Sequence, residues 1–427
     1  MTIYDKLLEA VEIPRFVKVH QKMVQSHIED PYRETEKQLA ESGALSAIRP
    51  GHSVCIACGS REIANLSEIV RAIVDGVKRA GGEPFLIPAM GSHGGATAEG
   101  QEEILLTYGL TEENVGAPIR SSMETVKIGE TENGLDVRID QYAAGADVII
   151  LAARIKPHTD FRGPVESGLM KMISIGMGKQ YGASICHSMG FPEMSANVRR
   201  IARVVLQTMP AVIGVGIIEN AFHETYQIAA LSGMEIDEKE PALLETAKSL
   251  MPRIPFAKCD VLFVDEIGKN ISGPGMDPNI TGRSVFMGRW EPDFDGVAVL
   301  DLTEESHHNG NGIGNADVTT KRFFDKFDMA TTYANSITCM DAPGVKMPAV
   351  MPNDRLAMKF ALNLAYKADP ATGPKVVWLH NTLCMHSYWI SEGLIGLAKE
   401  VDNMEIMTEP REVQFDADGN VIPFDWE

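Results

Sequence analysis

Side chains able to move protons or act as nucleophiles gather on the stretch from Lys156 to His187. An apolar run at residues 147–155, with the composition of a buried strand, leads directly into Pro157 and His158. Because ligands are commonly held in loops at the carboxyl ends of α/β strands, the sequence predicts a site here. After the loop come a turn, an apolar segment punctuated by glycine, and two further reactive groups: Ser167-Gly168-Leu169-Met170-Lys171, residues 172–178 and Cys186-His187.

A second candidate is His93, in the turn Gly91-Ser92-His93-Gly94-Gly95. This turn lies between an apolar, strand-like run at 84–90 and a predicted helix at 96–110. The glycines leave room for a ligand to approach the backbone. An imidazole titrates near neutrality, so His93 and His158 are candidate general bases.

The same residues admit other interpretations. His93 could be a turn or capping histidine, and Lys171 could lie along apolar surface with its ammonium in water rather than act as a desolvated nucleophile. The three histidines could equally hold zinc in a hydrolase or lyase, although no His-Glu-x-x-His motif supports a hydrolytic zinc site. Cys186 and His187, read as neighbours in an extended segment, would point to opposite faces and not pair. A binding protein without catalysis is a third hypothesis.

The composition narrows the class of protein. With 427 residues, 44% hydrophobic and 23% charged, the chain predicts a soluble protein of two domains. A net charge of −20 argues against nucleic acid or an anionic membrane as partner. Six scattered cysteines indicate reduced thiols and a cytoplasmic location. We see no signal peptide and no apolar run long enough to cross a bilayer.

Strand-like and helical patterns alternate along the chain. Predicted strands at 53–57, 84–90, 148–154 and 211–220 alternate with helices at about 66–80, 96–110 and 195–209, and a less regular β excursion spans 112–140. A second series has strands at 259–266, 296–302 and 375–381 and a helix at 355–366. We therefore predict an α/β fold of two domains, 1–252 and 256–398, each a mostly parallel sheet flanked by helices. The site is expected in the cleft between them, with a tail, 399–427, that can cross back to the first domain.

In their order and spacing these motifs resemble the nickel-dependent lactate racemase (LarA) family of 2-hydroxyacid racemases and epimerases. The family has an arginine after the first strand, a Gly-Thr/Ser-His turn, a Pro-His, a Ser-Gly-Gly-x-Lys turn and a later histidine. The counterparts here are Ser60-Arg61, Gly91-Ser92-His93, Pro157-His158, Ser167-Gly168-Leu169-Met170-Lys171 and His187. The resemblance covers the first domain well and the second loosely.

The resemblance implies an isomerase that uses nickel in a pyridinium-3,5-bisthiocarboxylic acid mononucleotide, the nickel-pincer nucleotide. Lys171 would anchor this cofactor, Ser167 and Gly168 would border it, and His187 would be the protein ligand to nickel. His93 and His158 would be the two general acid/bases. Cofactor-synthesis enzymes would then be partners, besides the small-molecule hydroxyacid, and an oligomer is compatible with the sequence.

Departures from the family pattern fall on the substrate-binding residues. Arg61 would bind the substrate or orient a histidine, and Pro274 stands where the family has a lysine that holds the substrate carboxylate. We expect either that this role passes to Lys269, Arg283 or Arg162, the last within a short insertion after His158, or that the substrate is held differently. These departures make a larger or more hydroxylated 2-hydroxyacid, such as a sugar acid, as good a candidate substrate as lactate, with His308 and Asn309 as hydroxyl partners.

Overall fold

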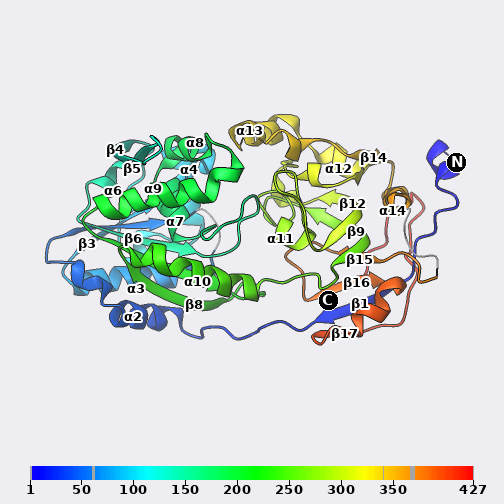
Figure 1. The fold of residues 1–427 in the computed structure, drawn as a ribbon, viewed down its shortest axis with the longest axis horizontal. Helices are drawn as coiled ribbons and strands as arrows, with labels where there is room; N and C mark the ends of the chain where they lie inside the picture. Colours follow the sequence, from blue (N-terminus) through cyan, green and yellow to red (C-terminus); the bar gives the residue numbers. More distant parts are fainter. Residues whose placement is uncertain (1, 60–62, 340, 366–370, 427) are drawn as a thin grey trace. The chain divides into compact units, whose positions relative to one another are not determined.

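The computed structural model describes residues 2–59, 63–339, 341–365 and 371–426 (Figure 1). They form two compact units, called here the N-terminal unit (Val24–Met251) and the C-terminal unit (Met1–Met23 with Pro252–Glu427). The sequence predicts residues 1–23 in the first domain, whereas the structure groups them with the second. The reason is that β1 (Phe16–Gln21) pairs with β16 (Ser387–Ser391) and β17 (Met404–Ile406).

A five-stranded sheet forms the centre of the N-terminal unit. Its strand order is β3-β2-β6-β7-β8; the first four strands are parallel and β8 is antiparallel to β7. Most residues of β2, β6 and β7 are buried, because helices cover both faces of the sheet and parallel strands become continuously apolar. The strands are β2 (Ser53–Cys58), β3 (Glu83–Pro88), β6 (Val148–Arg154), β7 (Val212–Glu219) and β8 (Thr225–Ser232).

Two apolar layers pack the helices of this unit onto the sheet. The helices α3 and α9 lie on opposite faces of the sheet (Figure 1). Ile69 and Ile73 of α3 join a core with Ile56, and Val198 of α9 joins a core with Leu151. The helices and short turns are α2 (Pro31–Glu41), η1 (Ala44–Ala47), α3 (Leu66–Arg79), η2 (Gly94–Ala96), α4 (Ala98–Thr107), α5 (Glu112–Val115), α6 (Gln141–Ala144), α7 (Leu169–Lys171), η3 (Met172–Gly176), α8 (Lys179–His187), η4 (Phe191–Glu193), α9 (Met194–Thr208) and α10 (Glu235–Leu250). The predicted β excursion contains the antiparallel pair β4 (Thr125–Glu130) and β5 (Asp136–Asp140).

The segment after the loop at 156–167 is helical. α7 leads into η3, a π-helical turn, and α8 ends at His187. The prediction that Cys186 and His187 lie in an extended segment is therefore wrong: the run 172–178, interrupted by glycine, reads locally as extended but packs as a helix against the sheet. π-Helical turns are uncommon and frequently lie at functional sites.

The C-terminal unit is built on an eight-stranded sheet of order β14-β13-β12-β9-β15-β16-β1-β17. Strands β14 to β15 in this order are parallel, and β16, β1 and β17 continue antiparallel. Its strands are β9 (Lys258–Ile267), β12 (Asp293–Leu302), β13 (Val318–Thr320), β14 (Ala349–Met351) and β15 (Val376–Leu379), with a short pair β10 (Arg283–Ser284) and β11 (Gly288–Arg289). Each unit thus has the mostly parallel, helix-flanked sheet that the sequence predicts.

Short helices connect the strands of the C-terminal unit. They are α1 (Ile3–Leu7), α11 (Pro278–Thr281), η5 (Glu304–Ser306), η6 (Ile313–Asn315), α12 (Lys321–Lys326), α13 (Met329–Cys339), η7 (Pro343–Val345), α14 (Asp354–Leu364), η8 (Glu392–Leu394) and α15 (Ile395–Ala398). In the parts of the chain that the structure describes, no helix combines the length and the apolar character needed to cross a bilayer.

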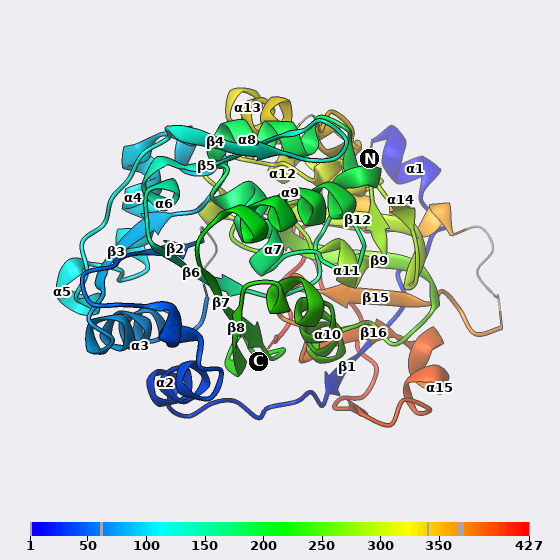
Figure 2. The same cartoon turned by 60° about the vertical axis from the view of Figure 1, so that its left-hand side comes forward.

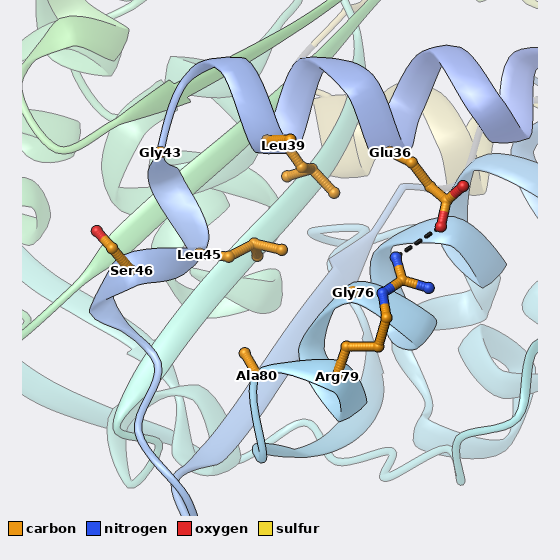
Figure 3. Close-up of a pocket in the computed structure, with 9 residues that line it drawn as sticks. Glu36, Leu39, Gly43, Leu45, Ser46, Gly76, Arg79 and Ala80 are labelled. Carbon is orange, nitrogen blue, oxygen red and sulfur yellow. Dashed lines mark hydrogen bonds and ion pairs between the residues drawn. The ribbon is translucent and has the colours of Figure 1, made fainter.

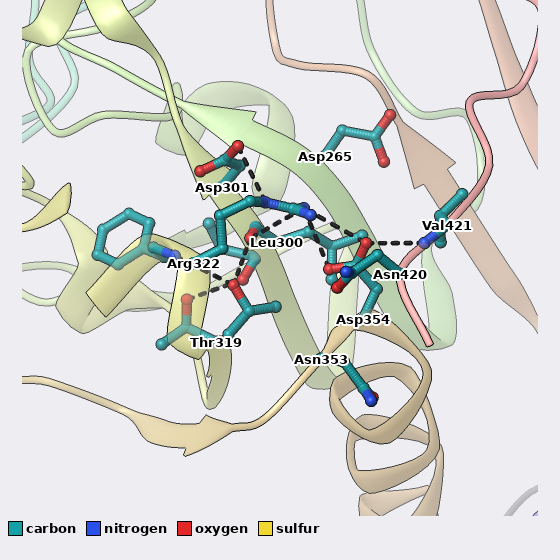
Figure 4. A network of polar contacts seen from close by, with 12 residues as sticks. Asp265, Leu300, Asp301, Thr319, Arg322, Asn353, Asp354, Asn420 and Val421 are labelled. Atoms are coloured by element: carbon teal, nitrogen blue, oxygen red, sulfur yellow. Dashed lines mark hydrogen bonds and ion pairs between the residues drawn. The ribbon is translucent and has the colours of Figure 1, made fainter. Parts of the chain in front are cut away.

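The tail at 399–427 is anchored within the C-terminal unit. Phe424 meets Trp378 edge-on, with ring centroids 4.8 Å apart. Asp354, 2% exposed, accepts hydrogen bonds from Val421 N at 2.9 Å and from Arg322 Nη2 at 3.1 Å, and Arg322 also contacts Asp301 at 3.0 Å (Figure 4). These contacts tie the end of the chain to the sheet at the ends of β12 and β13.

The close approach of η3 to the strand β3 depends on Gly176. A Cβ atom at Gly176 would lie 2.7 Å from the backbone oxygen of Ala89, so we expect Gly176→Ala to lower the free energy of unfolding by about 1–3 kcal/mol. Gly182→Ala in α8 is the matched control, since its Cβ would meet nothing nearer than 3.6 Å. Alanine there should stabilise by up to about 1 kcal/mol through helix propensity. Urea unfolding of both variants checks this, and equal stability of the two would contradict it.

Candidate active site

The N-terminal sheet has a topological switch point between β2 and β6. The chain runs from β2 to β3 on one side and later returns to β6 on the other side of β2. In open α/β sheets, ligands bind outside the carboxyl ends of the strands at such a point. His93 follows the end of β3 and His158 follows the end of β6. Arg61 follows β2 but lies outside the described residues.

His158 and Lys171 are in direct contact. The Nζ atom of Lys171 lies 2.7 Å from Nε2 of His158. The backbone N–H of Asp160 donates to Nδ1 of His158 at 3.0 Å, and the imidazole stacks on Phe161 at 4.1 Å between ring centroids. The Asp160 amide thus faces Nδ1 and the Lys171 side chain faces Nε2, so the loop fixes the plane of the ring and the direction in which each nitrogen points.

Glu166 organises the loop that holds His158. Its side chain is fully buried and accepts a hydrogen bond from the backbone N of His158 at 2.7 Å. Its charge is balanced by Lys248 at 3.2 Å and by Arg162 at 3.9 Å. Arg162 also donates to the carbonyl oxygen of Phe161 at 3.2 Å. A buried carboxylate needs such partners, and here they draw the loop into one shape.

The turn at Ser167 and Gly168 joins this loop to α7. Ser167 closes the loop by exchanging two backbone hydrogen bonds with Lys156, at 3.0 and 3.2 Å. At Gly168, a Cβ atom would lie 2.4 Å from Oε1 of Glu240. Glu240, on α10 and fully buried, accepts a hydrogen bond from Met170 N at 2.8 Å. The small residue therefore lets a buried carboxylate reach the first amides of the helix that carries Lys171.

His187 closes the stretch at the end of α8. Burial, and then the charge of Lys171, lower the pKa of His187 to about 4. The imidazole is therefore neutral at neutral pH, and neutral imidazole is the form that binds metal ions. Its ring meets Phe191 edge-on, with centroids 5.8 Å apart. Lys171 and His187 thus lie on one run of helical segments and are electrostatically coupled.

His93 lies on a turn anchored to the same run. The side chain is exposed at the start of η2, while the turn itself is held from two directions. Gly91 N donates to Gly176 O at 3.2 Å, and Gln101 Nε2 donates to His93 O at 3.1 Å. The structure therefore places the His93 turn against the segment that follows Lys171.

The substrate residues predicted in the second domain lie on loops of the C-terminal unit. Lys269 follows β9 and donates to Gly273 O at 2.6 Å. His308 and Asn309 follow β12; His308 Nδ1 is 2.9 Å from Lys326 O, and the Asn309 side chain accepts from Asn311 N at 3.1 Å. Both loops leave the carboxyl edge of the C-terminal sheet. The expected location between domains stays a prediction.

Several buried polar residues around the stretch escape prediction from the sequence. They are Glu240, Asp140, Gln101 and Lys179, each with an exposed fraction of 0% or close to it. Their segments read as ordinary amphipathic or turn sequence, so no local signal marks them. Only the packing of distant elements brings them beside the site.

Other features of the fold do not contribute to this site. A shallow groove lined by Leu39, Leu45 and Ala80 lies between α2, η1 and α3, with Arg79 and Glu36 paired at 2.6 Å (Figure 3). It lies on covering helices and not at the carboxyl edge of the sheet.

Within the described residues, no three His, Cys, Asp or Glu side chains are grouped so as to hold a metal ion.

The chain is thus an α/β protein in which His158 and Lys171 are in contact at the switch point of the N-terminal sheet. Residues 4–197 match the family model of the lactate racemase N-terminal domain. This match supports the resemblance to a LarA-like family that the ordered motifs predict, and it supports a racemase in general terms.

Two solved structures are similar to the chain. One is the lactate racemase apoprotein from Thermoanaerobacterium thermosaccharolyticum, with 13% identity, coverage of 84% of this chain and 88% of that one, and a TM-score of 0.45. The other is a protein from Thermotoga maritima, with 12% identity, coverage of 84% and 91%, and a TM-score of 0.45. No curated protein matches the chain.

The buried Glu240 generates a pH-dependent stability. Burial raises the pKa of Glu240 to about 7 from 4.5, so between these values the folded chain keeps a proton that the unfolded chain has lost. Stability therefore falls as pH rises through this window, by at most about 3 kcal/mol. We expect Glu240→Gln to remove this part of the pH dependence.

Urea unfolding from pH 4.5 to 8 measures this pH dependence, as the difference in free energy of unfolding between Glu240→Gln and the unchanged protein. Glu238→Gln, on the exposed side of the same helix, is the control and should leave the curve unchanged. If that difference for Glu240→Gln does not vary with pH, Glu240 is not the source of the pH dependence.

Proposed function

We propose that this chain is a racemase or epimerase of a 2-hydroxyacid that works by reversible hydride transfer with a nickel-pincer nucleotide. The observation that carries the proposal is the 2.7 Å contact between Lys171 Nζ and His158 Nε2 at the switch point of the sheet. The family match supports a racemase in general. The cofactor, the substrate and the role of each residue are our proposal.

The residues at this edge suit the proposed cofactor. Lys171 offers an amine near the start of a helical run, where Gly168 lets the buried Glu240 hold the first amides. His187 is a neutral imidazole on the same helical run, which suits a divalent metal ion. When bound, the nickel-pincer nucleotide would supply an acceptor for the Cα hydrogen as hydride. Such an acceptor is needed because a Cα–H beside a carboxylate is too weak an acid for simple proton abstraction.

His158 would act as the general base on one face of the substrate. In the structure its Nε2 faces Lys171; attachment of the cofactor to Lys171 would remove the amine's basicity and leave Nε2 for the substrate hydroxyl. The stacking of the imidazole on Phe161 keeps the ring oriented while the proton moves. A base with a pKa near neutrality is effective in both directions of a reversible reaction.

His93 would serve the opposite face. A planar 2-keto acid forms when hydride and proton have left, and inversion requires that a proton donor be present on each side. His93 is exposed on a turn packed against the segment after Lys171, so its side chain is accessible to a ligand. Two histidines with separate anchors fit a reaction that runs in both directions.

Positive and polar side chains are needed to hold an anionic substrate on a protein with a net charge of −20. We propose Arg61, Arg162 and Lys269 for the carboxylate. His308 and Asn309 are proposed for additional hydroxyl groups, which favours a hydroxyacid larger than lactate. Dependence on cofactor-synthesis enzymes and a cytoplasmic location belong to the same proposal. No observation favours the zinc hydrolase or lyase as a second candidate.

A mass-spectrometric experiment tests the attachment. The protein is produced together with the cofactor-synthesis enzymes, and the peptide containing Lys171 is analysed for an added mass and the protein for nickel. We expect the adduct on the unchanged protein and on Lys239→Ala, an exposed lysine of α10, and none on Lys171→Arg. Absence of both adduct and nickel from the unchanged protein would refute the proposal.

A panel of 2-hydroxyacids in ordinary and deuterated water tests the reaction. Hydride transfer predicts inversion with the Cα hydrogen retained, whereas proton exchange predicts deuterium at Cα. His93→Ala and His158→Ala should each lower kcat by about 10²–10⁴-fold, since each removes a general acid/base. His52→Ala, which precedes β2 at the opposite edge of the sheet, is the control and should retain full activity. A binding protein without catalysis would show no turnover in any variant.

A further inference from the structure

A fully buried lysine lies at the start of α8. Lys179 has an exposed fraction of 0% and a positive φ of 53°, a conformation that non-glycine residues rarely adopt. Lysine is almost never fully buried unless it is paired. The helix that begins at this lysine ends at His187.

Three acceptors from three different elements surround the ammonium group. Lys179 Nζ pairs with Asp140 Oδ2 at 3.2 Å, at the end of β5. It donates to the Pro88 carbonyl oxygen at the end of β3, and to Gln101 Oε1 on α4 at 3.2 Å. The contacts with Pro88 and Gln101 are hydrogen bonds, and the contact with Asp140 is an ion pair.

The contact with Lys179 fixes the orientation of the Gln101 amide. An ammonium cannot accept a hydrogen bond, so the Gln101 atom that faces it must be the oxygen. The amide nitrogen then points the other way and donates to Gly91 O at 2.9 Å and to His93 O at 3.1 Å. Gln101 is itself fully buried. A chain of hydrogen bonds thus runs from the start of α8 to the turn that carries His93.

The buried ion pair between Lys179 and Asp140 would be a costly arrangement if it served stability alone. Burial lowers the pKa of Lys179 and raises the pKa of Asp140, while the attraction between the two charges opposes both shifts. Asp140 also accepts hydrogen bonds from Tyr142 N at 2.7 Å and Ala143 N at 3.2 Å. Replacing a buried ion pair by well-packed apolar residues often leaves the stability of a fold unchanged or raises it. Apolar residues could not, however, orient the Gln101 amide.

We propose that Lys179, acting through Gln101, is a positioning residue that holds the His93 turn in register with the helical run from Lys171 to His187. The proposal rests on the proposed role of His93 as a general base. It assigns to Asp140 the part of balancing the charge of Lys179, and to Gln101 the part of transmitting its position. A catalytic imidazole on a glycine-rich turn needs such an anchor, because a misplacement of about 1 Å can lower a rate by about 10²-fold.

Hydrogen exchange in the protein without cofactor tests the anchor directly. Gln101→Glu keeps the shape and the acceptor for Lys179 but loses both donors to the turn. We expect faster exchange of the amides at 91–97 in this variant. Thr35→Val is the control; it removes a buried hydrogen bond to Pro31 O at 2.7 Å in α2, remote in the fold from the turn, and should leave 91–97 unchanged. Unchanged exchange in Gln101→Glu overturns the proposal.

The double variant Asp140→Asn, Lys179→Met separates positioning from stability. It removes both buried charges, so the melting temperature should be kept or raised, while the Gln101 amide loses its fixed orientation. We expect faster exchange at 91–97 in spite of this. If the double variant keeps its melting temperature and its amides at 91–97 exchange no faster, Lys179 serves only the stability of the fold. That outcome overturns the proposal even if Gln101→Glu itself fails to fold.

A double-mutant cycle on the loaded enzyme tests the link to His93. Gln101→Glu should lower kcat by about 10–100-fold with KM little changed, and it should cause no further loss in a His93→Ala background. A loss that multiplies with that of His93→Ala means that Gln101 does not act through His93, which overturns the proposal. If no hydroxyacid is turned over by any variant, the proposed function fails, and the exchange experiments alone decide whether the anchor exists.

Discussion

The parallel alignment of β2, β3 and β6 is the constraint on which the site depends. Parallel strands joined by crossover helices release the chain at one edge of the sheet, so three segments far apart in sequence begin side by side. The segment after β3 carries His93 and the segment after β6 carries His158 and Lys171. An antiparallel arrangement would have sent one of them to the opposite edge.

Buried charges then shape the segments that leave this edge. Glu166 draws the loop of His158 inward, Glu240 meets the first amides of α7, and Lys179 links α8 to its neighbours. Each of these groups is fully buried. Glu166 and Glu240 accept hydrogen bonds from backbone amides of the stretch, and Lys179 donates to the Pro88 carbonyl oxygen at the end of β3. A buried charge tolerates few geometries, so these contacts give otherwise irregular, glycine-rich segments a defined shape. The imidazole of His187 stays neutral in the same surroundings.

Much of the fold could be predicted from the sequence. The strand predicted at 148–154 is β6, the helix predicted at about 66–80 is α3 from 66 to 79, and the helix predicted at 195–209 is α9 from 194 to 208. These elements have strong apolar periodicity, which local sequence displays directly. The run from 169 to 187 was harder, because its glycines weaken every local pattern and its helical form depends on packing against the sheet. Residues 1–23 join the C-terminal unit through strand pairing that no local pattern reveals.

By itself, the sequence determined the α/β class, the alternation of strands and helices, and the ordered motifs that resemble a LarA-like family, because these depend on residue type and spacing along the chain. Tertiary structure alone decided that His158 Nε2 meets Lys171 Nζ, that Glu240 lies beneath Gly168, and that Gln101 connects Lys179 to the His93 turn. The physical reason is that the Glu240–Met170 and Gln101–Lys179 contacts join residues 70 and 78 positions apart. Gln101 also reaches back across the turn to Gly91 and His93, ten and eight positions away. Such contacts exist only when separate elements pack on the same sheet, and no pattern along the chain encodes the distance between them.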